Sequence, residues 1–146
     1  TNLRGAFFVS QEACKRMVRD NVPGQVVNVA SILGLRVGSN QVNYCTAKAG
    51  LLHMSRTMSA ELSRHQIRIN SICPGYFETE MNTDFFNSSQ GKAYLSRIPP
   101  KRLGQLNELD GPMLLYVNLV VPVYLQRKNK EIHTTNFCPQ IRTHKK

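Results

Sequence analysis

The sequence predicts an α/β fold built around a parallel β-sheet. Two short, apolar and largely β-branched segments, residues 25–31 and 67–73, have the composition of buried strands. Residues 41–65 lie between them with the periodicity of a long amphipathic helix, and a similar apolar stripe runs along residues 3–20. Strands joined by a crossover helix form a parallel, right-handed βαβ unit. The order helix, strand, helix, strand therefore indicates this fold class.

Turn residues mark the ends of these elements. Asn-Val-Pro-Gly at residues 21–24 follows the first helix, and Gly-Leu-Arg-Val-Gly-Ser-Asn at residues 34–40 predicts a loop after the first strand. Pro74 and Gly75 stop the second strand. Residues 80–100 contain scattered Gly and Ser, which predicts short helices in a mobile flap. A further helix is expected to start near Asn107, because Asn can cap a helix N-terminus.

The character of the sequence changes near Tyr116. Residues 119–126 could form a strand, which Pro122 would confine to a sheet edge. Six of the 19 Lys and Arg residues, and one of the nine acidic residues, lie in the last twenty positions, which therefore hold half of the net charge of +10. We predict one domain over residues 1–116 and a basic, irregular tail over 117–146, which resembles an out-of-frame continuation.

The composition restricts the class of protein. A chain of 146 residues, 41% apolar and 19% charged, can form one globular domain with a core. It contains no apolar run long enough for a membrane span, and no secretory signal is recognisable, so a cytoplasmic protein is predicted. The four cysteines form no CxxC pair and have no metal-ligand spacing with the histidines, which predicts reduced thiols and no metal site. No aromatic residues interleave with the basic ones, so a nucleic-acid partner is not predicted.

Polar groups gather at one edge of the predicted sheet, beyond the carboxyl ends of its strands, where such sheets bind ligands. Ser31 ends the first strand, residues 74–79 follow the second, and Tyr44 lies near the start of the crossover helix, four positions before Lys48. Residues four apart share a helix face, and an ammonium close to a phenol lowers the phenol's pKa, so this pair could act as a general acid and base. Taken alone, the pair is better explained as a surface lysine beside a half-buried tyrosine. Because several polar groups converge at one edge of the sheet, a catalytic role for the pair is the better interpretation.

The spacing of these residues resembles that of the classical short-chain dehydrogenases/reductases. Twelve residues separate Ser31 from Tyr44 and three separate Tyr44 from Lys48, as in the catalytic motif of that family. The segment Ile-Cys-Pro-Gly-Tyr-Phe-Glu-Thr at residues 72–79 is similar to the family's loop in which a Thr follows Pro-Gly by four positions.

Two further segments extend the resemblance. Thr-Asn-Leu-Arg-Gly at residues 1–5 is similar to the segment that supplies the family's fourth catalytic group, here Asn2. Residues 97–109 are similar to the stretch before the last helix. The resemblance covers residues 1 to about 115. It implies that residues 1–116 are the C-terminal, catalytic part of such a domain, with an incomplete Rossmann-type, doubly wound parallel sheet that lacks the N-terminal βαβ units.

The resemblance implies a role for each catalytic position. Tyr44 would give a proton to a substrate carbonyl or take one from an alcohol. Lys48 would hold the nicotinamide ribose and tune the acidity of Tyr44, and Ser31 would hydrogen-bond the substrate oxygen. Asn2 would hold a water molecule that links Lys48 to bulk solvent. Singly, each residue also has a structural explanation, as a turn residue, a cap or a surface group.

The resemblance also implies binding of NAD or NADP, which would perform the hydride transfer. Backbone near Phe77 and the Thr79 hydroxyl would fix the nicotinamide carboxamide. The cofactor-binding residues implied in this way are Tyr44, Lys48, Pro74, Gly75, Phe77 and Thr79.

The sequence departs from the family at both ends. It contains no G-x-x-x-G-x-G or G-x-G-x-x-G phosphate-binding loop and no residue that would choose between NAD and NADP. After residue 116 it also lacks the family's final strand. We therefore expect an oxidoreductase fragment whose parent reaction is reversible hydride transfer between NAD(P) and a carbonyl/alcohol pair, and an isolated chain without activity.

Two other interpretations stay open. The helices at residues 3–20 and 41–65 resemble those that form the family's dimer contact, so the chain could be a non-catalytic fragment that pairs through them; a homo-oligomer is expected in either case. A basic nucleic-acid-binding protein is the third and weakest interpretation. Cysteine chemistry is not predicted, because no His or carboxylate is placed to activate Cys45.

Overall fold

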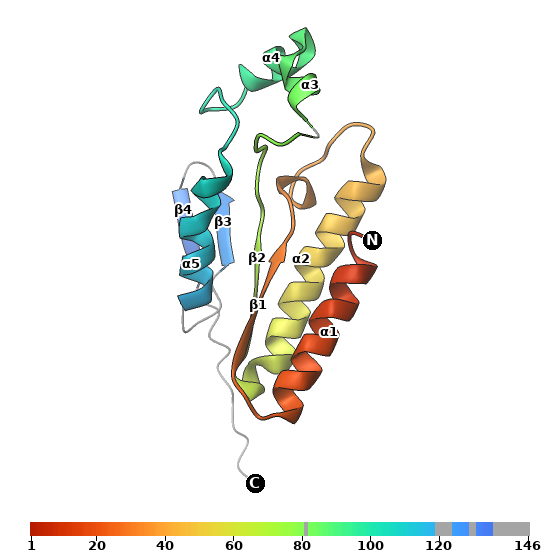
Figure 1. Ribbon diagram of the computed structural model, residues 1–146, viewed down its shortest axis with the longest axis vertical. Coiled ribbons are helices and arrows are strands. Elements are labelled where there is room, and N and C mark those ends of the chain that lie inside the picture. The colour runs from red at the N-terminus through yellow and green to blue at the C-terminus, as the bar shows by residue number, and fades with distance from the viewer. Residues whose placement is uncertain (81, 119–123, 129–130, 136–146) are drawn as a thin grey trace.

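A computed structural model describes residues 1–80, 82–118, 124–128 and 131–135 (Figure 1). The first four major elements are α1 (Arg4–Arg19), β1 (Gly24–Val29), α2 (Val42–Leu62) and β2 (Ile67–Ile72). The strands pair in parallel, with Gly24 opposite Ile67 and Val29 opposite Ile72. The predicted α/β class, with α2 as the crossover between two parallel strands, is confirmed.

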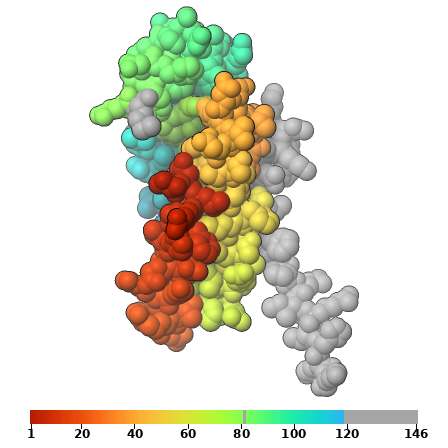
Figure 2. Space-filling model, turned by 90° about the vertical axis from the view of Figure 1, so that its right-hand side faces the viewer, coloured from red at the N-terminus to blue at the C-terminus, as the bar shows by residue number. Residues whose placement is uncertain are grey.

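Helices lie on both faces of the β1–β2 pair. Helices α1 and α2 run side by side along one face, and both are visible on the surface in Figure 2. Helix α5 (Asp110–Asn118) contacts β1 from the other side. A guanidinium nitrogen of Arg68, on β2, donates a hydrogen bond of 3.2 Å to the carbonyl oxygen of Val117 on α5. The strands therefore form the middle layer.

The core lies between the two strands and the α1–α2 layer. Ile67 and Ile69 of β2 are buried against Cys14 of α1 and Met58 of α2. A second cluster, nearer the carboxyl ends of the strands, joins Ala30 to Leu51 and Leu52. These contacts explain part of the apolar stripe of each helix, whereas Phe7 and Phe8 on α1 are exposed and do not face the sheet.

A buried polar network joins three elements of this core. Asn28 on β1 accepts a hydrogen bond of 3.3 Å from the Ser10 hydroxyl on α1. Its amide nitrogen donates a bond of 2.9 Å to the Ser55 hydroxyl on α2, and Ser55 in turn donates to the carbonyl oxygen of Leu51 at 2.8 Å. Burying these groups costs little free energy, because each has a partner.

The segment after β1 is more regular than predicted, and the predicted helix over residues 41–65 ends in a 3₁₀ turn. The expected loop begins with a short 3₁₀ helix, η1 (Ile32–Gly34), and α2 continues into η2 (Ser63–His65). Gln66 then adopts a left-handed conformation, with φ of 58°, and ends the turn before β2.

The predicted flap contains two short helices, α3 (Thr83–Asn87) and α4 (Ser89–Leu95). They pack so closely that a Cβ on Gly91 would overlap the carbonyl oxygen of Phe85 and lie 2.5 Å from the Cα of Phe86. Gly91 is therefore required for this contact.

The predicted cap at Asn107 is wrong. Residue 107 lies inside the 3₁₀ helix η3 (Leu106–Leu109), which precedes α5. Gln105 is the cap, and Glu108 accepts a bond of 2.7 Å from the Gln105 backbone N–H. The side chain of Glu108 also pairs with Arg102, and this pairing favours an earlier start for the helical segment.

The C-terminal segment, predicted as an irregular tail with a possible strand over residues 119–126, contains two strands in its described part. The strands β3 (Tyr124–Lys128) and β4 (Glu131–Thr135) pair antiparallel, with Tyr124 opposite Thr135. Aromatic and β-branched residues in these segments favour strands. Helix α5 also extends to Asn118, past the predicted boundary at residue 116. Pro122 lies outside the described residues, as do the remaining parts of the tail. No helix in the described ranges is long and apolar enough to cross a bilayer.

Candidate active site

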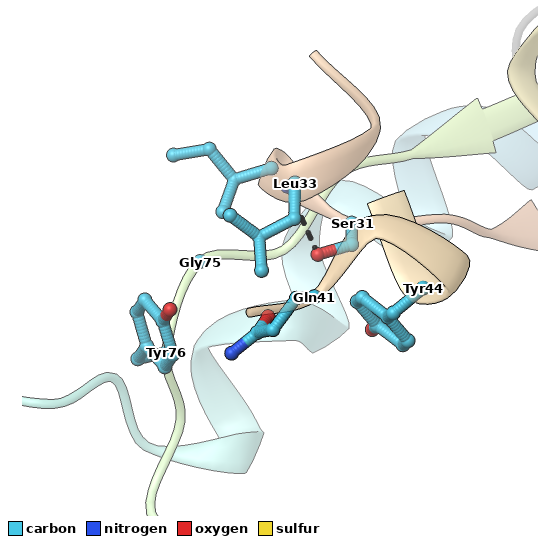
Figure 3. A pocket seen from close by; sticks show the side chains of 7 residues that line it. Ser31, Leu33, Gln41, Tyr44, Gly75 and Tyr76 are labelled. Carbon is cyan, nitrogen blue, oxygen red and sulfur yellow. Dashed lines mark hydrogen bonds between the residues drawn. The ribbon is translucent and has the colours of Figure 1, made fainter. Parts of the chain in front are cut away.

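A pocket of about 400 Å³ opens at the carboxyl ends of β1 and β2 (Figure 3). It brings together three of the predicted site residues, Ser31, Tyr44 and Gly75, which come from three separate segments. The complete lining is Ser31, Ile32, Leu33, Gln41, Tyr44, Gly75 and Tyr76. This position agrees with the rule that open parallel sheets bind ligands beyond the carboxyl ends of their strands.

Ser31 is held where β1 turns into η1. Its backbone is extended and its hydroxyl oxygen accepts a hydrogen bond of 3.1 Å from the backbone N–H of Leu33, which caps the 3₁₀ helix. The next residue, Ile32, donates its backbone N–H to the carbonyl oxygen of Pro74 at 3.0 Å. This bond ties the ends of the two strands together. Ser31 is only 8% exposed, so its hydroxyl has a fixed position.

Tyr44 and Lys48 lie one helical turn apart near the start of α2. The Lys48 ammonium is 5.6 Å from the centre of the Tyr44 ring and donates a hydrogen bond of 2.8 Å to the carbonyl oxygen of Val29, at the end of β1. Gly34 packs directly on this turn, because a Cβ there would lie 2.9 Å from the carbonyl group of Lys48. Lys48 does not line the pocket itself.

The loop after β2 is fixed by a short parallel contact with Gly104. The N–H of Gly104 donates to the carbonyl oxygen of Tyr76 at 3.0 Å, and the N–H of Glu78 donates to the carbonyl oxygen of Gly104 at 3.1 Å. Phe77 lies between these two bonds, so its own backbone groups face the other way. Its carbonyl oxygen accepts from the Asn82 amide at 2.7 Å, whereas its N–H has no partner in the described part of the chain.

Thr79 is exposed and does not cap α3. The cap residue of that helix is Asn82, whose side chain accepts a hydrogen bond of 3.1 Å from the Thr79 backbone N–H. The Thr79 carbonyl oxygen accepts from the Thr83 hydroxyl at 2.9 Å. The hydroxyl of Thr79 has no hydrogen-bond partner among the residues described here.

Asn2 precedes α1 in an exposed turn and does not line the pocket. Its neighbour Leu3 packs on α2, since a Cβ on Gly50 would lie 3.0 Å from a methyl group of Leu3. The Asn2 side chain makes no hydrogen bond within the described ranges, so its role stays a prediction.

Four lining residues were not predicted from the sequence, namely Ile32, Leu33, Gln41 and Tyr76. Gln41 carries a usable signal, because it immediately precedes the helix that holds Tyr44. Tyr76 lies between Gly75 and Phe77, both of which were predicted. Its pKa is raised to about 12, first by burial and then by the neighbouring Tyr94 hydroxyl.

Metal and cysteine chemistry gain no support in the described part of the chain. No cluster of three or more His, Cys, Asp or Glu side chains there could hold a metal ion. Cys14, Cys45 and Cys73 are free thiols, and burial raises the pKa of Cys14 and of Cys73. Cys138 lies outside the described residues.

The parallel strands, the crossover helix and the Ser–Tyr–Lys arrangement define a Rossmann-like α/β class of protein, and comparisons identify the family within it. The profile of the family described as short chain dehydrogenase matches residues 1–90. The chain belongs to this family. The profile match covers the N-terminal part of the chain and ends at residue 90, whereas the resemblance was predicted to extend to about residue 115.

Curated relatives agree with this assignment. The chain is 40% identical over 110 residues to the 3-oxoacyl-[acyl-carrier-protein] reductase MabA of Mycobacterium avium, covering 75% of this chain and 42% of the relative. It is 38% identical over 114 residues to the L-rhamnose 1-dehydrogenase (NAD(P)(+)) of a Sphingomonas strain, covering 77% of this chain and 45% of the relative. The chain thus spans less than half the length of these relatives.

Solved structures of dehydrogenases also superpose on this chain. A gluconate 5-dehydrogenase from Burkholderia cenocepacia, in complex with NADP and tartrate, superposes with a TM-score of 0.74 at 29% identity, over 80% of this chain and 46% of that one. A short-chain type dehydrogenase/reductase from Mycobacterium marinum gives 0.72 at 35% identity, over the same shares. A 4-hydroxyisoleucine dehydrogenase complexed with NADH gives 0.74 at 27% identity, over 78% of this chain and 47% of that one.

Proposed function

We propose that residues 1–116 act as the catalytic part of a classical short-chain dehydrogenase/reductase. The reaction is reversible hydride transfer between NAD or NADP and a carbonyl/alcohol pair. The observation that carries this proposal is the shared pocket of Ser31, Tyr44 and Gly75 beyond the carboxyl ends of β1 and β2. In the sequence these three residues are far apart, and a purely structural role for each would not require them to line one space.

Ser31 would hold the substrate oxygen. A hydroxyl has one proton and two lone pairs. The Leu33 N–H occupies one lone pair, and the Ser31 proton has no acceptor in the described part of the chain. That proton is available to a carbonyl oxygen in the pocket, where a fixed donor stabilises developing negative charge.

Tyr44 would transfer the proton. A general acid or base works best when its pKa lies near the working pH. The second tyrosine of the pocket, Tyr76, is a poor candidate because its pKa is raised to about 12. Lys48 lies beside Tyr44, and its ammonium has three protons, of which Val29 takes one. The other two protons would serve the ribose hydroxyls, and Asn2 would support the proton relay.

The residues present fit the nicotinamide end of the cofactor. The unpartnered N–H of Phe77 and the free hydroxyl of Thr79 lie two positions apart in the loop after β2, and they can donate to and accept from a carboxamide. A Cβ added to Gly75 would meet no atom within 4 Å, and Pro74 fixes the loop to Ile32, so a flat ring could approach the backbone. When bound, NAD or NADP would supply or accept the hydride.

The adenosine end has no matching loop in this sequence. Pyrophosphate binding in this fold relies on glycine-rich backbone at a helix N-terminus, and the sequence lacks that motif. We therefore propose that the 146-residue chain alone binds NAD(P) weakly and has no measurable dehydrogenase activity.

Titration of the chain with nicotinamide mononucleotide, NAD and NADP, followed by NMR, tests this proposal. We expect all three to bind with similar dissociation constants on the order of a millimolar or weaker, and to shift the amide signals of Phe77 and Thr79. Thr79→Val should weaken binding on the order of fivefold, because one hydrogen bond is lost. Thr57→Val, the same change away from the pocket, is the control.

Two results would contradict the proposal. Micromolar binding of NAD, worth about 8 kcal/mol, would mean that the chain contains an adenosine site of another kind. Nicotinamide mononucleotide that left the signals of residues 74–79 unchanged would remove the assigned cofactor contacts.

A specific observation also favours the second candidate, pairing between copies through α1 and α2. Phe8 and Val9 on α1 are 52% and 72% exposed. A hollow of about 460 Å³ lies between the two helices, lined in part by Phe7, Val18 and Leu62. Exposed apolar surface of this kind marks contact sites. Sedimentation of the wild type should show a dimer that Phe8→Glu dissociates; a wild-type monomer at micromolar concentration would exclude this candidate.

A further inference from the structure

Two polar groups in the pocket have no part in the proposed proton transfer. Gln41 precedes α2 at its cap position, yet its side-chain amide makes no capping bond and no other hydrogen bond in the described ranges. Tyr76 lines the same pocket, and its hydroxyl also has the Tyr94 hydroxyl as a hydrogen-bonding neighbour. In Figure 3, the Gln41 side chain lies between Tyr76 and Tyr44, below Ser31.

Packing contacts hold the side chains of Gln41 and Tyr76 in place. A Cβ on Gly38 would lie 3.3 Å from the amide oxygen of Gln41 and 3.3 Å from a methyl group of Leu33, so all three are packed together. The Tyr76 ring meets the rings of Phe86 and Tyr94 edge to face, with centroids 5.5 Å and 5.1 Å away. The flap helices α3 and α4 therefore hold Tyr76 at the pocket.

The residues that line the pocket are uncharged. None of these seven described residues carries a formal charge, although the Lys48 ammonium lies 5.6 Å from the centre of the Tyr44 ring. An amide offers both a donor and an acceptor, and a phenol does the same. Ile32 and Leu33 supply an apolar wall. A carboxylate bound against Gln41 and Tyr76 would find no cation among the lining residues to offset its lost hydration, which is costly.

Resting on the carbonyl–alcohol chemistry proposed above, we propose that Gln41 and Tyr76 bind a second, neutral oxygen of the substrate, so that the site takes hydroxy-ketones and the corresponding diols. Ser31 and Tyr44 hold the reacting oxygen, and the Gln41–Tyr76 pair selects the second hydroxyl. A simple ketone lacks this group, and a keto acid presents a charge in its place. Both should bind less well.

The test uses three ketones of similar size and the full chain. Butan-2-one, hydroxyacetone and pyruvate are titrated into the 15N-labelled protein in an excess of nicotinamide mononucleotide, and the amide signals of residues 31–33 and 75–76 are followed. We expect hydroxyacetone to bind on the order of tenfold more tightly than butan-2-one, through two added hydrogen bonds. Pyruvate should bind no more tightly than butan-2-one.

Variants assign the preference to the two side chains. Gln41→Leu and Tyr76→Phe should each weaken hydroxyacetone binding by roughly two- to fivefold and leave butan-2-one unchanged. Gln11→Leu, on α1 and outside this pocket, is the matched control. A wild-type preference that survives both pocket variants would overturn the assignment to Gln41 and Tyr76.

The possible failures are distinguishable. If butan-2-one shifts the pocket signals and hydroxyacetone binds no more tightly, the proposed carbonyl site stands and the Gln41–Tyr76 inference fails. Preferential binding of pyruvate would overturn the inference in the same way. If no ketone affects these signals, the carbonyl function of the pocket fails as well.

Discussion

The ammonium of Lys48 lies 5.6 Å from the centre of the Tyr44 ring while it donates a hydrogen bond to the carbonyl oxygen of Val29. The strand carbonyl restricts the long lysine side chain, so the positive charge stays beside the phenol. A residue on β1 thus contributes to the environment of a residue on α2. The contact agrees with the spacing of four residues seen in the sequence.

Tyr44→Phe should abolish turnover when residues 1–118 replace the equivalent part of a complete relative such as the mycobacterial MabA. Phe keeps the ring and removes only the proton, so kcat should fall by roughly 10²- to 10⁴-fold while cofactor affinity changes by less than about twofold. Steady-state kinetics and cofactor titration of the chimera measure both. Cys45→Ala, one position further on, is the control and should retain activity. A Tyr44→Phe chimera with more than half of the control's kcat would exclude the assigned role.

Gly75→Ala should weaken cofactor binding without destabilising the fold. Gly75 has no positive φ and no atom within 4 Å of the new methyl group, so the free energy of unfolding should stay the same or rise by about 0.4–1 kcal/mol. The methyl group would enter the pocket, and binding of nicotinamide mononucleotide should weaken. Denaturant unfolding and NMR titration measure the two effects. A clear loss of stability would show that Gly75 is needed for the fold itself.

Gly91→Ala should destabilise the flap. The new methyl group meets the backbone of Phe85 and Phe86, which cannot move as a side-chain end can, so we expect a loss of about 1–3 kcal/mol in the free energy of unfolding. Gly5→Ala is the control, because this site is helical and open. The control should stabilise the protein by up to about 1 kcal/mol. Equal effects at the two glycines would contradict the close contact between α3 and α4.

Glu108 should titrate far below an ordinary glutamate. The Arg102 guanidinium, at 2.6 Å, and then the Gln105 backbone N–H lower the pKa of Glu108 to about 2. Because the folded pKa lies below the unfolded one, the stabilising contribution is complete above about pH 4.5 and is lost as the pH falls toward 2.

Carboxyl 13C shifts measured against pH report this titration directly. In Arg102→Gln the midpoint should rise toward 4.5, the ordinary value. Both side chains are partly exposed, so added salt should also raise the midpoint in the wild type. A wild-type midpoint near 4.5 at low salt would mean that the pair does not form in solution.

The elements that the sequence predicted correctly are those with a strong periodic signal. Helices α1 and α2 and strands β1 and β2 bury apolar residues at regular intervals, so composition and period locate them. The grouping of Ser31, Tyr44 and Gly75 followed from the parallel topology, which brings strand ends to one edge.

The remaining features depend on contacts that a sequence does not display. Gln41 and Tyr76 reach the pocket through the local path of the chain and the packing of the flap. The cap at Gln105, rather than at Asn107, depends on the side chain of Glu108 and its pairing with Arg102. The possible strand over residues 119–126 overlaps β3, whereas β4 and its pairing with β3 were not predicted, because the dense charge hides the strand signal of the β-branched residues there.

Asn28 influences the register in which strand β1 pairs with strand β2. Successive strand residues point to opposite faces, so a one-residue error in β1 would turn Asn28 away from Ser10 and Ser55 and insert Val27 or Val29 between the two hydroxyls. Ser10 would lose its acceptor inside an apolar layer, whereas Ser55 would keep only its bond to Leu51. Val26 and Ile69 alone would tolerate such a shift, because one branched apolar side chain fills space much like another. The hydrogen bonds of the Asn28 amide therefore favour one strand register over its one-residue shifts, the register in which Gly24 lies opposite Ile67.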